Sequence, residues 1–171
     1  IGWYWYSLWI GDRNMDYLID ARDEGFEEKN PGWKEDISQS YRNDNVLHFY
    51  DTIWRVSLQA FDKPREVQVV IDSNDNLFIS VGNGGLVTFG GQDEQTIGMK
   101  FPVKEWIHTH PFGAAYFSGT DMNTIFMYQR HMIKATVLGN NQRAVYYIGI
   151  EEDNGDRVER ITVERQNEEE L

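Results

Sequence analysis

Residues 107–121 read IHTHPFGAAYFSGTD and give the strongest indication of how this chain folds. His108 and His110 would point to the same face of an extended strand, because strand side chains alternate between two faces. Pro111 favours that strand, since the residue before a proline is disfavoured in the helical region. Asp121 follows where the chain turns into a predicted helix. Two imidazoles and one carboxylate are three protein ligands, the number typical of catalytic zinc sites, which keep a fourth position for water.

Each part of this stretch also has an ordinary explanation. A His-x-His pair occurs often by chance, and an aspartate at the start of a helix is commonly a cap. The chain has only four histidines, however, and two of them form this pair. Ser118 and Asp121 then follow at the turn from strand to helix. The combination favours metal ligands over a helix cap alone.

The same residues carry a resemblance to a known family. His-x-His-Pro, followed by Ser-Gly-x-Asp with ten residues between the second His and the Asp, resembles the JAMM (MPN-plus) zinc metalloproteases. Glu105-Trp106-Ile107 resembles the strand before the family's first His, and Met122-Asn123-Thr124 resembles the segment after its Asp. The resemblance covers about residues 60–150, and residues 1–45 have no counterpart in it.

This resemblance implies a fold, a cofactor and a kind of family member. The fold would be α/β (α+β), with a curved mixed sheet flanked by helices in a three-layer, cytidine-deaminase-like architecture. The cofactor would be one Zn²⁺ per chain, held by His108, His110 and Asp121. The short stretch between Glu66 and His108 has no obvious helix, which resembles a compact prokaryotic or phage-type member more than a eukaryotic lid subunit.

A catalytic site of this kind also needs a general base, and Glu66, Glu94 and Glu105 are the candidates. Glu105 stands three residues before His108 and would point to the opposite face of the strand. Glu94 falls in a glycine-bearing loop. Glu66 lies in Pro64-Arg65-Glu66-Val67, which resembles the family's Pro-x-Glu before its first core strand. We therefore predict Glu66 as the base, although Gln68-Val69-Val70 departs from the Gly and Leu that often follow in the family.

Ser118 matches the family's serine between the histidine pair and the aspartate. Its hydroxyl could donate to the oxyanion of a tetrahedral intermediate. It could equally cap the helix that begins near Asp121, and both roles are compatible.

The function that the resemblance implies is hydrolysis of an amide or isopeptide bond. The substrate would be a polypeptide, such as a ubiquitin-like tail or a precursor. The alternative is a non-catalytic MPN-like scaffold, or a virion or assembly component, with a vestigial or structural metal site. A zinc deaminase is disfavoured because those enzymes usually need cysteine ligands, and this chain has no cysteine.

Composition limits the partners. The 171 residues carry a net charge of −12, which argues against binding to a nucleic-acid backbone. No apolar run is long enough to cross a bilayer, so no membrane partner is expected. The expected location is the cytoplasm, or a virion if the chain is of phage origin. The aromatic segment 1–6 predicts a strand or a packing arm, or else an interface with another protein.

The resemblance implies a JAMM/MPN-like metallopeptidase domain at residues 46–165, with an N-terminal extension of unknown role at 1–45 and a charged tail at 166–171. Helical spacing favours a helix at 45–61 capped by Asp44, a helix from Ser118 or Thr120 to about 132, and a short helix at 16–28. The predicted strands are 67–71, 77–81, 86–89, 103–110, 134–138, 144–150 and 158–163.

Overall fold

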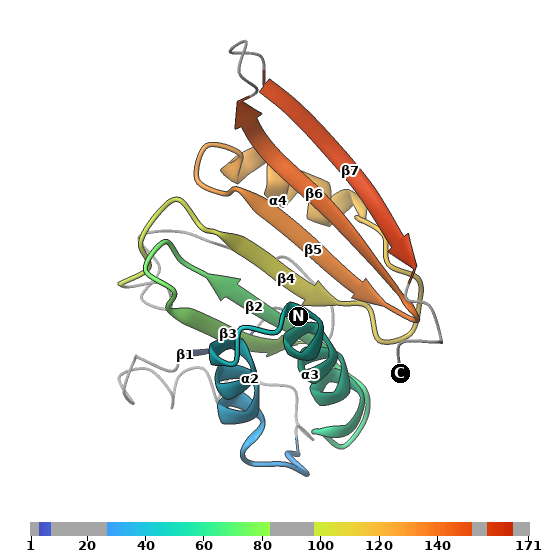
Figure 1. Cartoon of the computed structure of the whole chain (residues 1–171). Coiled ribbons are helices and arrows are strands. Elements are labelled where there is room, and N and C mark those ends of the chain that lie inside the picture. Colours follow the sequence, from blue (N-terminus) through green and yellow to red (C-terminus); the bar gives the residue numbers. More distant parts are fainter. Residues whose placement is uncertain (1–3, 8–26, 83–97, 152–156, 166–171) are drawn as a thin grey trace.

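The computed structural model describes the backbone of residues 4–7, 27–82, 98–151 and 157–165, and the side chains of residues 27–82 and 98–148 (Figure 1). The described helices are α2 (Trp33–Arg42), α3 (Val46–Gln59) and α4 (Gly119–Tyr128). The strands are β1 (Tyr4–Ser7), β2 (Glu66–Ile71), β3 (Leu77–Gly82), β4 (Glu105–Thr109), β5 (Lys134–Gly139), β6 (Gln142–Glu151) and β7 (Arg157–Arg165).

These strands form one mixed sheet in the order β1-β3-β2-β4-β5-β6-β7. Strands β4 and β5 are parallel, and every other neighbouring pair is antiparallel. Parallel neighbours need a crossover connection, and α4 supplies it between β4 and β5. The prediction of a mixed α+β sheet flanked by helices is therefore confirmed.

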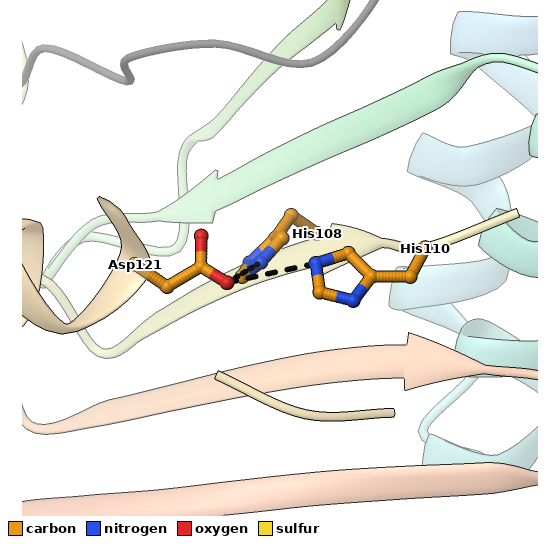
Figure 2. Close-up of side chains that lie close together, drawn as sticks. All are labelled: His108, His110 and Asp121. Atoms are coloured by element: carbon orange, nitrogen blue, oxygen red, sulfur yellow. Dashed lines mark ion pairs between the residues drawn. The ribbon is translucent and has the colours of Figure 1, made fainter. Parts of the chain in front are cut away.

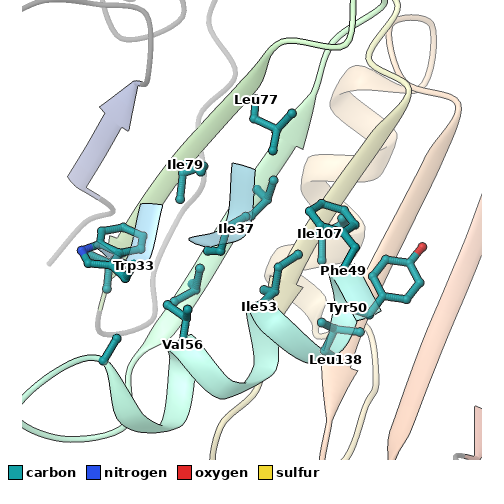
Figure 3. Close-up of a cluster of buried hydrophobic side chains, with 14 of the residues drawn as sticks. Trp33, Ile37, Phe49, Tyr50, Ile53, Val56, Leu77, Ile79, Ile107 and Leu138 are labelled. Carbon is teal, nitrogen blue, oxygen red and sulfur yellow. The ribbon is translucent and has the colours of Figure 1, made fainter. Parts of the chain in front are cut away.

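Helices cover both faces of the sheet, so the molecule has three layers (Figure 1). Alternation along β2 and β4 divides their side chains between two cores. Val69 and Ile107 face α2 and α3, in the cluster drawn in Figure 3. Val70 and Trp106 face the opposite way and pack with Ile125 of α4. The histidine pair lies on the α4 face, because His108 alternates with Ile107.

Helix α2 was not predicted from the sequence. Its composition is polar, but Trp33 and Ile37 are completely buried between α3 and the sheet. Two apolar residues four positions apart are enough to anchor one face of a ten-residue helix. The core on this face therefore includes residues of α2 as well as of α3 and the sheet.

Helix α3 was predicted almost to its ends, but its cap was assigned wrongly. Asn45, not Asp44, is the N-cap, and its side chain accepts a hydrogen bond of 3.1 Å from the His48 backbone N–H. Asp44 instead adopts a positive φ of 55° and makes the turn between the two helices.

The remaining elements differ from the predictions mainly at their ends. Strand β4 is shorter than 103–110, and Val103 forms an isolated bridge with Met132, beyond the end of α4. Glu28, placed in the predicted helix 16–28, forms a bridge with Phe61 instead. The strand predicted at 86–89, the tail 166–171, residues 1–3 and 16–26, and Glu94 lie outside the described residues. Among the described helices, none combines the length and apolar character that crossing a membrane requires.

Candidate metal centre

Three side chains that are distant in sequence meet at the end of β4 (Figure 2). His108 and His110 leave the same face of the strand, and Asp121 reaches them from the first turn of α4. Asp121 Oδ2 lies 3.0 Å from His108 Nε2 and 3.5 Å from His110 Nε2. One ligand atom from each residue lies within 4.8 Å of the others. This group could hold a metal ion.

The donor set fits zinc in chemistry and in spacing. Two ligands about 2.0–2.1 Å from a common tetrahedral centre lie roughly 3.3 Å apart. The two nitrogen–oxygen distances of 3.0 and 3.5 Å lie on either side of that value. In addition, both ring nitrogens of His108 are buried and lack a hydrogen bond of good geometry. A buried polar atom without a partner is costly, and a metal ion would satisfy it.

Burial and charge set the protonation of the two histidines differently. His108 is only 2% exposed, and burial lowers its pKa despite the neighbouring Asp121 carboxylate. Burial acts in the same direction on His110, but the Asp121 carboxylate and the charge of Glu66 outweigh it and raise the pKa. The neutral form of His108 is the form that binds metals.

Asp121 is fixed by the helix that carries it. Ser118 is the N-cap of α4, and its hydroxyl oxygen accepts a hydrogen bond of 3.1 Å from the Asp121 N–H. In return, the Ser118 N–H donates to Asp121 Oδ2 at 2.9 Å. This reciprocal capping box orients the carboxylate toward the histidines. Burial alone would raise the pKa of Asp121, but the imidazoles of His108 and His110 close to its carboxylate hold the pKa far below its usual range.

Glu66 stands at the first position of β2 and faces the same pocket as the three ligands. The backbone N–H groups of the residues before and after it, Arg65 and Val67, are both hydrogen-bonded. Ser57 of α3 accepts from the Arg65 N–H through its carbonyl oxygen, and the Val67 N–H donates to Thr109 Oγ1 at 2.9 Å. Burial raises the pKa of Glu66 to about 7, with a smaller opposing effect from His110.

Glu105, the other described candidate for the base, faces away from the ligands, as strand alternation predicts. Its carboxylate accepts hydrogen bonds from Tyr50 at 2.6 Å and from Thr136 at 2.7 Å, on the α3 side of the sheet. His131 and His48 are both exposed on other parts of the surface, so neither joins the group of ligands.

The pocket at the site has a volume of about 330 Å³. Its lining residues are Glu66, His108, His110, Pro111, Phe112, Gly113, Tyr116, Ser118, Thr120 and Asp121. Phe112 and Tyr116 are 80% and 56% exposed and form an apolar mouth. A larger hollow of about 450 Å³ between α2 and α3 is lined by none of the candidate ligands.

The loop between the histidines and α4 is anchored to the end of β5. His110 N–H donates to the Leu138 carbonyl at 2.8 Å, and Asn140 N–H donates to the Gly113 carbonyl at 2.9 Å. Gly139 lies so close to this loop that a Cβ there would come within 2.5 Å of the Ala114 carbonyl carbon. A glycine at 139 is needed for that approach. The exposed Phe112 side chain therefore belongs to a loop whose backbone is held against the end of β5.

No family model, curated protein or solved structure matches the chain.

The sequence predictions for the site concern five residues, and all five line one pocket: His108, His110, Asp121, Glu66 and Ser118. The sequence interpretation did not identify Phe112 and Tyr116 as wall residues. Their position inside the loop between the ligands was the available signal, since such a loop must border the site.

Proposed function

We propose that the chain is a JAMM-type zinc peptidase or isopeptidase, a hydrolase of amide bonds in a polypeptide. The observation that carries this proposal is the buried His108 ring, whose Nδ1 has no hydrogen-bond partner among the described residues and whose Nε2 faces the Asp121 carboxylate at 3.0 Å, beside a second imidazole. Three ligands that face a pocket containing a further carboxylate match a catalytic zinc site better than a structural one, because structural sites are closed by four ligands.

His108, His110 and Asp121 would hold the metal, one Zn²⁺ per chain. Zinc, when bound, would supply Lewis-acid activation of a water molecule and of the substrate carbonyl. The chain's own residues must then bind the substrate, orient it and move protons.

Glu66 is the proton carrier in this proposal. Its carboxylate would accept a proton from the attacking water and donate it to the nitrogen of the leaving amine. A general acid–base group works best when its pKa is near the working pH, and the pKa of about 7 that burial gives Glu66 meets this condition. A bound metal would lower the pKa of Glu66, so the main support for its role is the position of its carboxylate in the pocket.

Ser118 would orient the substrate carbonyl. Its capping bond to Asp121 uses a lone pair of the hydroxyl oxygen and not the hydroxyl proton. The proton can therefore be donated into the pocket that Ser118 lines, where one donor to a developing oxyanion contributes substantially to rate.

The walls of the pocket favour an internal amide of a polypeptide over a free carboxyl terminus. No lysine or arginine occurs among the described residues that line it, so a terminal carboxylate would have no cation to pair with. Phe112 and Tyr116 offer apolar contact to side chains beside the scissile bond. Strand β4 has neighbours on both sides, so a substrate would not add to the sheet beside the ligands.

The second candidate, a non-catalytic MPN-like scaffold, also has an observation in its favour. The capping box with Asp121 gives Ser118 a complete structural role without any catalysis. A scaffold role does not explain why the His108 ring is buried without a partner for Nδ1, or why Glu66 lies in the same pocket. Turnover separates the two candidates.

Metal content tests the site. We expect one zinc per purified chain by elemental analysis, and less than a tenth of that in His108→Ala and in Asp121→Ala. His131→Ala is the matched control, since this histidine is exposed and away from the pocket, and it should keep full zinc. Full zinc in either ligand variant, or iron in place of zinc in the wild type, would contradict the assignment.

Turnover tests the activity. We expect the zinc-loaded chain to cleave members of a fluorogenic peptide library or fusions to ubiquitin-like tails. Glu66→Gln should keep its zinc and lose about a hundredfold or more in rate. Glu105→Gln is the control, because its carboxylate faces the other side of the sheet. A zinc-loaded chain that cleaves none of these substrates would favour the scaffold.

A further inference from the structure

We infer that Trp106, held in place by Gln68, is a positioning residue that sets the plane of the His108 ring and thereby the affinity for metal. This inference rests on the proposed metal site and deepens it.

Trp106 stacks on the metal-ligand ring. The centroids of the indole and imidazole rings lie 4.6 Å apart with an interplanar angle of 17°. Both residues leave the same face of β4, two positions apart, so the strand itself brings the rings into register. Trp106 is 0% exposed and His108 is 2% exposed, so the stack is dry. A parallel contact of this kind resists rotation of the imidazole about its Cβ–Cγ bond.

Gln68 fixes the indole in turn. The Trp106 Nε1–H donates to Gln68 Oε1 at 3.0 Å, and Gln68 is itself 0% exposed. In the β2–β4 pairing, Gln68 is directly opposite His108. A hydrogen bond at the edge of the indole, from a residue across the ladder, defines the tilt of the ring that lies against His108. Gln68 therefore positions Trp106, and Trp106 positions His108.

The usual means of orienting a metal-binding histidine is missing from the described residues. Such a ligand almost always donates its second ring N–H to a carboxylate, a carbonyl or water. His108 Nδ1 is buried and has no hydrogen-bond partner in the described part of the chain. The stack on Trp106 is therefore a contact that can orient the ring, together with the T-shaped contact with the His110 ring, whose centroid lies 5.1 Å away.

Trp106 is also part of the core cluster on the α4 face, and the test must separate that role from positioning. Phe78 provides a matched control. It belongs to the same cluster, is 1% exposed and is another large aromatic residue on a neighbouring part of the sheet. Truncating either side chain removes core packing, but only Trp106 stacks on His108.

The experiment measures the zinc dissociation constant by competition with a chelating dye, and the unfolding midpoint without metal, for four variants. We expect Trp106→Leu to bind zinc about 10- to 100-fold more weakly, the range found when partners of a ligand are removed. Trp106→Phe should recover most of that affinity because it restores an aromatic face. Gln68→Met should weaken binding by a smaller factor. Phe78→Leu should lose stability and keep wild-type affinity.

A second readout does not depend on affinity. Cobalt replaces zinc in such sites and reports ligand geometry through its visible absorption. The cobalt spectrum should change in Trp106→Leu and remain unchanged in Phe78→Leu. If Trp106→Leu does not fold, Gln68→Met and Trp106→Phe still decide the question, because the inference requires weaker binding in the first and near-normal binding in the second.

Equal zinc affinity in Trp106→Leu and Phe78→Leu, with unchanged cobalt spectra, would overturn the positioning role. That outcome would leave the proposed metal site and activity standing, because both are measured on the wild-type chain. Failure of the wild-type chain to bind zinc would instead overturn the metal site, and the inference with it.

Discussion

His108 shows how much of the site depends on single residues. Its ring is buried, stacked on Trp106 and without a hydrogen bond of good geometry, an arrangement that is unfavourable unless a ligand completes it. Asp121 and Glu66 bring two carboxylates to the same pocket. A metal ion would neutralise this concentration of negative charge. Without the metal, the two carboxylates should lower the free energy of unfolding.

The first prediction concerns the cost of burying Glu66. Its pKa is about 7 in the folded chain against an ordinary 4.5, so between these values the folded state holds more protons than the unfolded state. Stability therefore falls as pH rises from about 4.5 to about 7 and then levels off. Removing this charge by Glu66→Gln should stabilise the metal-free chain at pH 8 by on the order of 2 kcal/mol, after allowance for the part of the carboxyl that reaches solvent.

Urea unfolding of the two metal-free chains at pH 4.5 and pH 8 measures the difference. At pH 4.5 the carboxyl is protonated in the folded state and about half protonated in the unfolded state, so Glu66→Gln should change the stability little. An equal change at both pH values would show that the substitution acts through packing and not through charge.

The second prediction concerns Ser118. Because it is the N-cap of α4, Ser118→Ala should lower the free energy of unfolding by about 1 kcal/mol. If its hydroxyl also donates to the substrate, kcat should fall by on the order of 10²-fold while zinc content stays the same. We expect both effects. Ser118→Thr keeps the hydroxyl and should retain most of the activity, whereas unchanged kcat in Ser118→Ala would leave the residue as a cap alone.

At the scale of elements, the ligands depend on the crossover from β4 through α4 to β5. His108 and His110 lie at the end of β4, and Asp121 lies in the first turn of α4. The loop that joins β4 to α4 packs closely against Gly139. The opposite face of β4 rests on α3, which in turn packs against α2. The site therefore depends on helices that contribute no ligand.

The third prediction tests the part that α2 plays. Trp33 is completely buried and its ring meets that of Phe61 edge-to-face at 5.1 Å. Trp33→Ala should destabilise the chain by about 3–5 kcal/mol, because it leaves a large cavity in the core. Trp54→Ala is the control, since Trp54 is only partly buried against the same cluster and should cost less. Chemical unfolding followed by circular dichroism gives both values, and a Trp33→Ala chain as stable as the wild type would make α2 an independent extension.

At the scale of the whole molecule, a bound metal would fasten α4 to the sheet. We predict that removing it with a chelator lowers the unfolding midpoint. At a free metal concentration of a hundred times the dissociation constant, the stabilisation lost is about 2.7 kcal/mol. His108→Ala should unfold at the same midpoint with and without chelator. A wild-type midpoint that does not respond to chelation would mean that the three ligands hold no metal in solution.

The sequence by itself determined the strand that carries the histidines, the helix that follows and the mixed α+β class. Strong local signals were responsible, since alternation orients His108 and His110 together, Ser118 begins a helix and Pro111 keeps the chain extended before it. The same alternation predicts that Glu105 faces away from the ligands, whereas the choice of Glu66 rested on the resemblance of Pro64-Arg65-Glu66 to the family's Pro-x-Glu.

Only the tertiary structure decided which residues support the ligands and which helices belong to the core. Helix α2 was missed because its polar sequence hides two residues whose burial depends on α3 and the sheet. The contact of Gln68 with Trp106, and the exposure of Phe112 at the pocket mouth, depend on the pairing of β2 with β4 and on the anchoring of the loop to β5. Such contacts join residues far apart in the chain, and local sequence patterns contain no information about which distant partner a residue will meet.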